Sequence, residues 1–238
     1  MEKAHNFIID FDSTFVKVEA FDELCKLCYT NENERSVILD QVKAITDKGM
    51  RGELSINESL ESRLLLLNAH KKHLKPLIEI LRGMVSASFS ANKEFLKLNA
   101  DKVFIVSNGF CEFILPVVLE YGIKAENVFA NSFIFDEYEN IIGFDHSNLL
   151  ASPQGKVKLV SQLNLSGEII VIGDGYTDYE VREAGIASVF YAFVENVRRD
   201  NVVSKADHVA ATFDQIISDY EKKLNQVNQI TNLLKKSA

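Results

Sequence analysis

Short runs of consecutive apolar residues recur along the chain and are separated by longer segments with helical periodicity. We expect strands at 5–10, 103–106, 129–135, 141–144, 169–173, 188–193 and 208–210. Apolar runs of this length are typical of strands that are buried on both faces, as in a parallel sheet. Because the runs alternate with helical segments after residue 103, the pattern predicts an α/β fold with a doubly wound, mostly parallel sheet.

Helical periodicity fills the segment between the first two strands. Apolar residues recur there three or four positions apart, at Ile38, Val42 and Ile45, at Leu60, Leu64 and Leu67, and at Leu74, Leu77, Ile78 and Leu81. Ser55 and Glu58 have the spacing of a capping box. The gap of about 90 residues far exceeds what a simple crossover between parallel strands needs. We therefore expect a small helical cap inserted at 15–85 into a core formed by 1–14 and 86–238.

Turn and cap signals divide the second half of the chain. Residues 111–121 and 153–163 have helical patterns, and the second helix is predicted to begin with Ser152 as its cap and Pro153 at its first position. Residues 136–140 have the composition of a turn between two short strands.

From Phe213 onward, apolar residues repeat with helical spacing at 213, 216, 217, 220, 224, 227, 230, 233 and 234. This spacing predicts one long amphipathic helix. Its apolar face either packs on the outer face of the sheet, which we favour, or forms a self-association surface through its last two turns. A monomer and a homodimer are therefore both open.

Composition narrows the class of protein. The 238-residue chain is 47% apolar, enough for a large core, and its net charge of −8 does not suggest a nucleic-acid surface, for which a basic patch is expected. Three cysteines do not indicate a disulfide framework, and neither a signal peptide nor a membrane-spanning run is recognisable. We expect a cytoplasmic protein without nucleic-acid or membrane partners.

Cys25 and Cys28 form a C-x-x-C pair within a segment of helical periodicity. A zinc site would need a second pair or histidines at ligand spacing, and Cys111 and the histidines are scattered. We interpret the pair as two thiols that share one helix face.

Aspartates follow two of the predicted strands. Asp10 and Asp12 close the first run, and Asp174 and Asp178 follow the run at 169–173. Parallel strands present their carboxyl ends at one edge of the sheet, where ligands bind. Carboxylates gathered there would repel one another unless a cation lay among them. Because carboxylates and the carbonyl of Asp12 are hard oxygen ligands, the pattern predicts a Mg²⁺ site.

Two further elements suit a phosphoryl group. Ser107, Asn108 and Gly109 end a predicted strand, and the hydroxyl and backbone N–H groups of such a turn can hold phosphoryl oxygens. Lys156 follows Gly155 at a helix start and can offset the negative charge of carboxylates and phosphate.

These residues together suit transfer of a phosphoryl group to a carboxylate. Asp10 can attack phosphorus and form an aspartyl phosphate. Asp12 can donate a proton to the departing alkoxide and later take one from water. Asp174 would ligate the metal, with Asp178 in support.

Each motif alone is also compatible with a different function. A receiver module that is merely phosphorylated on an aspartate also uses an acidic cluster, a hydroxyl and a lysine, but it needs no cap of this size. Gly173-Asp174-Gly175 resembles a truncated dinucleotide fingerprint, yet Asp178 stands where the third glycine would be. The conjunction of four elements in one order favours phosphoryl transfer.

That order resembles the motif signature of the haloacid dehalogenase superfamily of phosphotransferases and, more narrowly, of the phosphoserine phosphatase family. Asp10-Phe11-Asp12-Ser13-Thr14 resembles motif I, Ser107 motif II, Lys156 motif III and Gly173-Asp174-Gly175-x-x-Asp178 motif IV. Asn127-Val128-Phe129-Ala130-Asn131 and Asn196-Val197-Arg198 extend the resemblance over the chain up to about residue 215.

The resemblance implies a Rossmann-like core and a helical cap that closes over the substrate. It implies that Glu19 takes the ammonium group of the substrate and Arg63 its carboxylate, so that a zwitterion is held at two points. The other substrate-binding residues that it implies are Ser107, Asn108, Gly109 and Thr177.

Three positions depart from the family pattern. Asn108 stands where glycine is usual, Ile56 replaces a phenylalanine that lines the cap pocket, and Thr177 stands where many bacterial members have asparagine. These differences bear on substrate preference more than on the chemistry.

The resemblance therefore implies a Mg²⁺-dependent hydrolase that converts O-phospho-L-serine to L-serine and phosphate through an aspartyl phosphate, the last step of serine biosynthesis. The catalytic residues that we expect are Asp10, Asp12, Ser107 and Lys156, and the metal site is expected at Asp10, Asp12, Asp174 and Asp178. A related phosphatase for another small phosphomonoester, such as a phosphoamine or a sugar phosphate, is the alternative.

Overall fold

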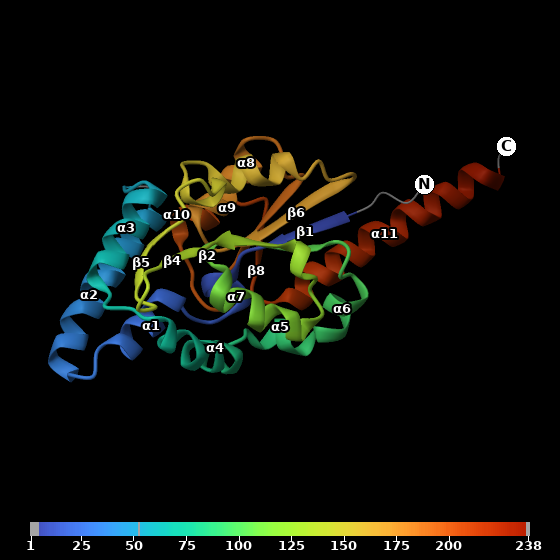
Figure 1. Ribbon diagram of the computed structural model, residues 1–238. Helices are drawn as coiled ribbons and strands as arrows, with labels where there is room; N and C mark the ends of the chain where they lie inside the picture. The colour runs from blue at the N-terminus through green and yellow to red at the C-terminus, as the bar shows by residue number, and fades with distance from the viewer. Residues whose placement is uncertain (1–4, 52, 237–238) are drawn as a thin grey trace.

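A six-stranded sheet forms the centre of the computed structural model, which describes residues 5–51 and 53–236 (Figure 1). The strand order is β3-β2-β1-β6-β7-β8, and neighbouring strands are parallel throughout. The strands are β1 (His5–Ile9), β2 (Val103–Phe110), β3 (Val128–Asn131), β6 (Glu168–Gly173), β7 (Val189–Phe193) and β8 (His208–Ala210). The predicted α/β fold with a mostly parallel sheet is confirmed.

Helices cover both faces of the sheet because the side chains of its strands alternate between two apolar layers. In β1, Phe7 and Ile9 belong to one layer and Ile8 to the other. The first layer is covered by α5 (Ala87–Ala91), α6 (Lys93–Leu98), α7 (Cys111–Val118) and α11 (Phe213–Lys236). The second is covered by α8 (Gly155–Gln162), α9 (Tyr176–Glu183) and α10 (Asp200–Val203). This is the doubly wound arrangement.

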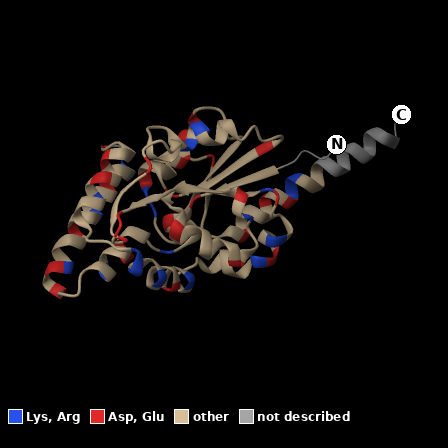
Figure 2. Ribbon diagram, in the orientation of Figure 1, with Lys and Arg blue, Asp and Glu red and all other residues tan. Residues whose placement is uncertain are grey.

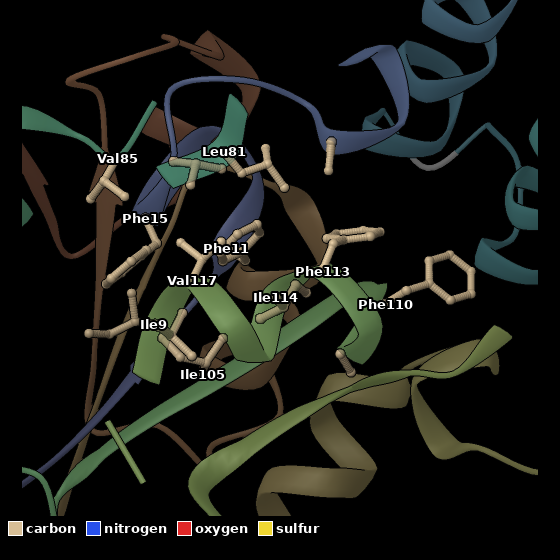
Figure 3. Close-up of a cluster of buried hydrophobic side chains, with 14 of the residues drawn as sticks. Ile9, Phe11, Phe15, Leu81, Val85, Ile105, Phe110, Phe113, Ile114 and Val117 are labelled. Atoms are coloured by element: carbon tan, nitrogen blue, oxygen red, sulfur yellow. The ribbon is translucent and has the colours of Figure 1, made fainter. Parts of the chain in front are cut away.

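Aromatic rings fill the first layer where β1 ends. Figure 3 shows Phe11, Phe15 and Phe113 grouped beside Ile9 and Ile105. The rings of Phe11 and Phe15 are stacked with centroids 6.1 Å apart, and both side chains are fully buried. This packing fixes the backbone of residues 11–15, which directly follows Asp10.

Four of the helices that lie between β1 and β2 in the described part of the chain precede the core helices α5 and α6. They are α1 (Ala20–Cys28), α2 (Glu32–Met50), α3 (Ile56–Leu66) and α4 (Leu74–Gly83). Helices α1, α2 and α3 lie together at one end of the sheet (Figure 1). Val16 and Val85 pair in an antiparallel bridge, so the chain leaves and rejoins the core at one place. We propose that these helices are the cap and keep 15–85 as its boundaries.

The start of α3 agrees with the sequence prediction. The Ser55 side chain accepts a hydrogen bond from the Glu58 N–H, and the Glu58 carboxylate accepts one from the Ser55 N–H. The predicted capping box is therefore present. Cys25 and Cys28 both lie in α1, as expected for two thiols on one helix.

One predicted strand is divided in two. The segment expected as a strand at 129–135 forms β3 in the main sheet and then β4 (Phe133–Phe135), which pairs antiparallel with β5 (Ile141–Phe144). The prediction of a single strand was wrong. The polar residues Asn131 and Ser132 interrupt the apolar run, and the chain leaves the main sheet there.

The helix expected at 153–163 begins two residues later than predicted. The hydroxyl of Ser152 donates to the carbonyl of Leu149 and closes the preceding turn, so it does not cap the helix. Gln154 occupies the cap position with a φ of +55°. Pro153 thus lies in the turn and not at the first helical position.

Helix α11 confirms the long helix predicted from Phe213 onward. Phe213, Ile216 and Ile217 at its start are buried in the first apolar layer. The side chains of 227–236 lie outside the described part of the structure, and with them the predicted apolar positions 227, 230, 233 and 234. Among the described residues, no helix has both the length and the apolar character needed to cross a membrane.

Charged residues are distributed over many elements. Figure 2 shows acidic and basic residues interspersed along the helices on the visible side of the molecule. The net charge of −8 is therefore not carried by any one helix in that view.

Candidate active site

The carboxyl ends of three adjacent strands bring the predicted groups together. Asp10 directly follows β1, Ser107 lies in β2 and Asp174 directly follows β6. β1 pairs with β2 on one side and with β6 on the other. All three side chains are buried. The prediction that these residues meet at one edge of the sheet is consistent with this placement.

Lys156 links Asp10 to Asp178. Its Nζ lies 2.8 Å from Oδ1 of Asp10 and 2.7 Å from Oδ1 of Asp178, and the side chain is 3% exposed. Burial alone would lower the pKa of Lys156, but the two carboxylates outweigh burial and raise that pKa above its ordinary value. The ammonium group therefore stays charged and holds Asp10 at a fixed position.

Two glycines allow the close approach of these groups. A Cβ atom on Gly155 would lie 2.3 Å from the carbonyl oxygen of Leu149, which leaves no room for a side chain beside Lys156. A Cβ atom on Gly173 would lie 2.2 Å from Cγ of Asp178. Glycine is therefore required at both positions.

Three buried carboxylates form a group that suits a metal ion. Asp10, Asp174 and Asp178 each offer an oxygen, and these oxygens lie within 4.8 Å of one another. Burial and then the charge of Asp10 raise the pKa of Asp178 to about 7. A divalent cation would relieve this repulsion, and hard oxygen ligands suit Mg²⁺. The Asp12 carboxylate is not in this group. The ligand atom predicted for Asp12 is its backbone carbonyl, which stays a prediction.

Asp12 reaches the site by a turn and not by continuation of the strand. We expected a continued strand that would place Asp12 on the same side as Asp10. Instead β1 ends at Ile9, and residues 11–15 form an irregular turn in which Asp12 is extended and Ser13 is left-handed. An extended strand could not continue through this turn, because Ser13 adopts a φ of +54°. The sequence pattern contains no signal of this conformation.

The environment of Asp12 favours its protonated form. Burial and then the negative charge of Glu19 raise the pKa of Asp12 well above its usual value. Its Oδ1 accepts a hydrogen bond of 2.7 Å from the N–H of Ala20, which fixes the direction of the carboxyl group. A carboxyl group whose pKa is raised holds its proton more readily, which suits a general acid.

A cavity of about 50 Å³ lies between the carboxylates and helices α1–α3. Eight predicted site residues line it, namely Asp10, Asp12, Glu19, Arg63, Ser107, Asn108, Gly109 and Thr177. The other lining residues are Phe21, Thr46, Gly49, Ile56 and Ser59. Lys156 instead lines an adjoining cavity of about 340 Å³, which shares Gly49, Ile56, Asn108 and Thr177 with the first.

Arg63 is held in the wall of the smaller cavity. Its guanidinium carbon lies 4.4 Å from the centre of the Phe21 ring, and its Nε donates to the carbonyl of Ser59 at 3.2 Å. Nη1 donates to the hydroxyl of Thr46 at 3.5 Å. Burial lowers the pKa of Arg63, although nearby Glu19 opposes this effect. These contacts leave the rest of the guanidinium group available to a ligand.

The Ser107-Asn108-Gly109 segment is held by hydrogen bonds within the core. The Gly109 N–H donates to the Ser107 hydroxyl at 3.0 Å, and the Asn108 side chain donates to the Leu150 carbonyl at 2.8 Å. The Thr177 hydroxyl donates to the Asn108 side chain at 3.4 Å. The Asn108 side chain therefore connects the segment to α9.

Sequence reasoning missed Arg199 as a residue of this site. One of its guanidinium nitrogens contacts the Asp174 carboxylate, and another lies 3.6 Å from Oε1 of Glu19. The Thr14 hydroxyl also donates to Asp174, at 2.9 Å, and the Ser13 hydroxyl donates to Glu19 at 2.6 Å. Arg199 directly follows the Asn196-Val197-Arg198 motif, but no periodicity marks a single residue in an irregular loop.

Comparison with known proteins assigns a family to this fold and site. A family model for haloacid dehalogenase-like hydrolases matches residues 5–184. The chain belongs to this family. This membership confirms the predicted superfamily and the prediction of a hydrolytic enzyme, and it decides against the receiver and dinucleotide-binding alternatives.

The haloacid dehalogenase-like hydrolase has several similar relatives. It is 29% identical over 215 residues to the chloroplastic phosphoserine phosphatase of Arabidopsis thaliana, covering 89% of this chain and 70% of that protein. It is 29% identical over 216 residues to the phosphoserine phosphatase of Homo sapiens, covering 90% and 92%. Its structure is similar to that of a phosphoserine phosphohydrolase-like protein from Francisella tularensis, with a TM-score of 0.82, 28% identity, and 90% and 99% of the chains covered.

Proposed function

We propose that this haloacid dehalogenase-like hydrolase is a Mg²⁺-dependent phosphatase that converts O-phospho-L-serine to L-serine and phosphate. The observation that carries this proposal is one small cavity that is lined on one side by residues suited to phosphoryl transfer and on the other by residues suited to binding an amino acid. Asp10, Asp12 and Ser107 line it on the side of the sheet, whereas Glu19 and Arg63 line it on the side of the cap. The relatives named phosphoserine phosphatases support the same assignment.

In the proposed first step, a carboxylate oxygen of Asp10 attacks phosphorus and the bond from phosphorus to the serine oxygen breaks. Asp12 gives its proton to that oxygen, and L-serine leaves. Water then attacks the aspartyl phosphate, Asp12 takes a proton from it, and phosphate leaves with Asp10 restored. Both roles of Asp12 fit a carboxyl group whose pKa is raised and whose direction is fixed by Ala20.

The remaining core residues hold the phosphoryl group during both steps. The hydroxyl of Ser107 and the backbone of Asn108 and Gly109 would bind its oxygens, and Lys156 keeps Asp10 oriented. Mg²⁺ would be held by the carboxylates of Asp10, Asp174 and Asp178 and by the carbonyl of Asp12. When bound, the ion offsets the charges of the carboxylate and the phosphate.

The cap side of the cavity would select an amino acid. Arg63 can pair with a carboxylate and Glu19 with an ammonium group, so that the two charges of phosphoserine are each matched. The volume of about 50 Å³ favours a small leaving group. We further propose that the reaction serves serine biosynthesis in the cytoplasm, in a monomer or a homodimer.

Hydrolysis of a substrate panel tests this proposal. Phosphate release from O-phospho-L-serine, O-phosphoethanolamine, glucose 6-phosphate and p-nitrophenyl phosphate is measured with Mg²⁺ and with a chelator. O-phospho-L-serine is expected to give the highest kcat/KM, and the chelator is expected to abolish turnover. Arg63→Ala is expected to lower kcat/KM for O-phospho-L-serine by roughly 10- to 100-fold, because a hydrogen bond to a charged group is lost.

Arg51→Ala is the matched control, because Arg51 is an exposed arginine beside the same helices. It is expected to leave kcat/KM unchanged. Unchanged turnover of O-phospho-L-serine by Arg63→Ala would contradict the substrate assignment. A higher kcat/KM for the phosphoamine or the sugar phosphate would support the alternative substrate class.

A further inference from the structure

Asn196 donates hydrogen bonds to two segments that are distant from it in the sequence. It lies in the loop between β7 and α10. Its side-chain Nδ2 lies 3.0 Å from the carbonyl oxygen of Ser13, 3.2 Å from that of Thr14 and 3.4 Å from that of Val16. The same nitrogen lies 2.7 Å from the hydroxyl of Ser86. One amide group therefore contacts both segments.

The first of these segments is the turn that carries Asp12. Ser13 in this turn has a left-handed backbone, which is strained for a residue other than glycine. No regular helix or strand can satisfy the carbonyls of Ser13 and Thr14 in such a turn. The Asn196 amide takes that role, so it stabilises the backbone at Ser13 and directly after it.

The second segment is the connection between the α1–α4 helices and the sheet. The N–H of Lys17 donates to the carbonyl of Met84 at 2.8 Å, and the N–H of Ser86 donates to that of Phe15 at 2.9 Å. The hydroxyl of Ser86 donates to the carbonyl of Thr14 at 2.6 Å. Residues 15–18 and 84–86, which we call the two linkers, are therefore joined to each other and to the turn.

The loop that carries Asn196 is fixed at both of its ends. The Glu195 carboxylate accepts from the backbone N–H of Ser88 at 3.1 Å and also from its hydroxyl. Arg199 contacts Asp174 and Glu19. Asn196 thus lies between an anchor in α5 and the candidate metal site.

We propose that Asn196 is a positioning residue that locks the Asp12 turn to the two linkers, so that the placement of the cap helices and the alignment of Asp12 depend on each other. Asn196 does not line the cavity, so it acts through the backbone of the turn and not by touching the substrate. The inference uses the proposed roles of Asp10 and Asp12, and it does not depend on phosphoserine as the substrate.

Kinetics of two substitutions test this role. Asn196→Ala removes the amide donors. Asn196→Asp keeps the size of the side chain but places a carboxylate oxygen opposite the carbonyl oxygens that the amide nitrogen contacts. Both are expected to lower kcat by about tenfold or more with KM within about twofold, because small misplacements of a catalytic group are costly. The same loss is expected for p-nitrophenyl phosphate as for O-phospho-L-serine, since neither Arg63 nor Glu19 is altered.

Hydrogen exchange gives a readout that needs no substrate. The amides of Lys17 and Ser86 are expected to exchange at least about tenfold faster in Asn196→Ala than in the unaltered protein, because the linkers lose a shared donor. Asn201→Ala, an exposed asparagine in the neighbouring helix, is the matched control and is expected to change neither kcat nor these exchange rates.

A double-mutant cycle with Ser86→Ala separates coupling from general destabilisation. Ser86→Ala removes one of the partners of Asn196, and the effects on kcat of the two substitutions are expected to be less than additive when combined. The inference is overturned if Asn196→Ala unfolds at lower temperature but retains kcat and slow exchange at Lys17 and Ser86. If the unaltered protein does not hydrolyse O-phospho-L-serine, the substrate assignment fails, whereas the exchange result still decides the role of Asn196.

Discussion

Buried charges dominate the site at the scale of single residues. The carboxylates of Asp10, Asp174 and Asp178 are buried, and two cations, Lys156 and Arg199, contact them. Buried ions are tolerated when each has a partner of opposite charge, and removing one partner leaves an uncompensated charge. The three carboxylates exceed the two cations by one charge, which is consistent with a site that also binds a divalent ion.

Asp22 differs from these carboxylates, because its side chain is half-buried and one of its oxygens has no hydrogen-bond partner among the described residues. Burial and then the charge of Glu19 raise the pKa of Asp22 from 3.8 to about 6. Between these two pH values the folded protein binds more protons than the unfolded chain, so stability is lost as the pH rises through this window. At neutral pH the buried carboxyl group of Asp22 is ionised, and the loss of stability that this ionisation causes is present.

Asp22→Asn is therefore expected to raise the free energy of unfolding by about 1–3 kcal/mol at pH 8, and by much less at pH 4.5. Thermal or urea unfolding at the two pH values measures this difference. Asp47→Asn, at an exposed position of α2, is the control and is expected to show no such dependence on pH. If Asp22→Asn proved less stable than the unaltered protein at pH 8, ionisation of the buried Asp22 carboxylate would not destabilise the fold as its burial implies.

At the scale of elements, the position of each candidate site residue depends on how a helix or strand begins or ends. Asp10 and Asp174 follow strands directly, and Lys156 is the second residue of α8. Arg63 lies in the last turn of α3, a helix of 11 residues whose start is held by the capping box. The position of Arg63 in the cavity wall therefore depends in part on a hydrogen bond two turns away.

Ser55→Ala is expected to lower the free energy of unfolding by about 1 kcal/mol, because the first turn of α3 loses its cap. Urea unfolding measures the change. Ser62→Ala lies in the interior of the same helix and is the control. Alanine is the better helix former there, so this substitution is expected to be neutral or slightly stabilising. Equal effects of the two substitutions would show that the cap has no special role.

Apolar runs located the strands of the sheet, although they placed the end of β2 at 106, whereas the strand continues through Ser107 to Phe110. They located the strands because central parallel strands are buried on both faces. The aspartates after β1 and β6 were predictable for the same reason, since their position depends only on where a strand ends. The start of α8 and the path of the chain to Asp12 were not predictable, because each depends on a left-handed backbone conformation, at Gln154 and at Ser13. Arg199 and Asn196 act from an irregular loop, and their roles become visible only when distant segments are placed together.

At the scale of the whole molecule, the C-terminal helix closes the first apolar layer. Phe213 is fully buried, and its ring stacks on that of Phe89 with centroids 4.4 Å apart. The ring of Phe95 contacts it edge-on at 5.7 Å. The N–H of Phe213 also donates to the hydroxyl of Ser88, which binds Glu195. One residue thus joins α11 to two other helices and to the loop of Asn196.

Phe213→Ala is expected to lower the free energy of unfolding by about 3–5 kcal/mol, because a large buried ring is replaced by a cavity. Chemical unfolding followed by circular dichroism measures the loss. Leu98→Ala is the control, because Leu98 is 85% exposed and its truncation is expected to change stability by less than about 0.5 kcal/mol. A loss below about 1 kcal/mol for Phe213→Ala would show that α11 contributes little to the core.

The central position of β1 has a consequence for synthesis of the chain on the ribosome. β1 is translated before both of its neighbours, β2, which begins at Val103, and β6, which begins at Glu168. Until β6 has been translated, the nascent chain leaves one side of an apolar strand open to pairing with other molecules. Asp10 and the residues that it meets, Lys156, Asp174 and Asp178, likewise come together only after this late step. A truncated translation product is therefore expected to lack the assembled candidate site and to be a client for chaperones.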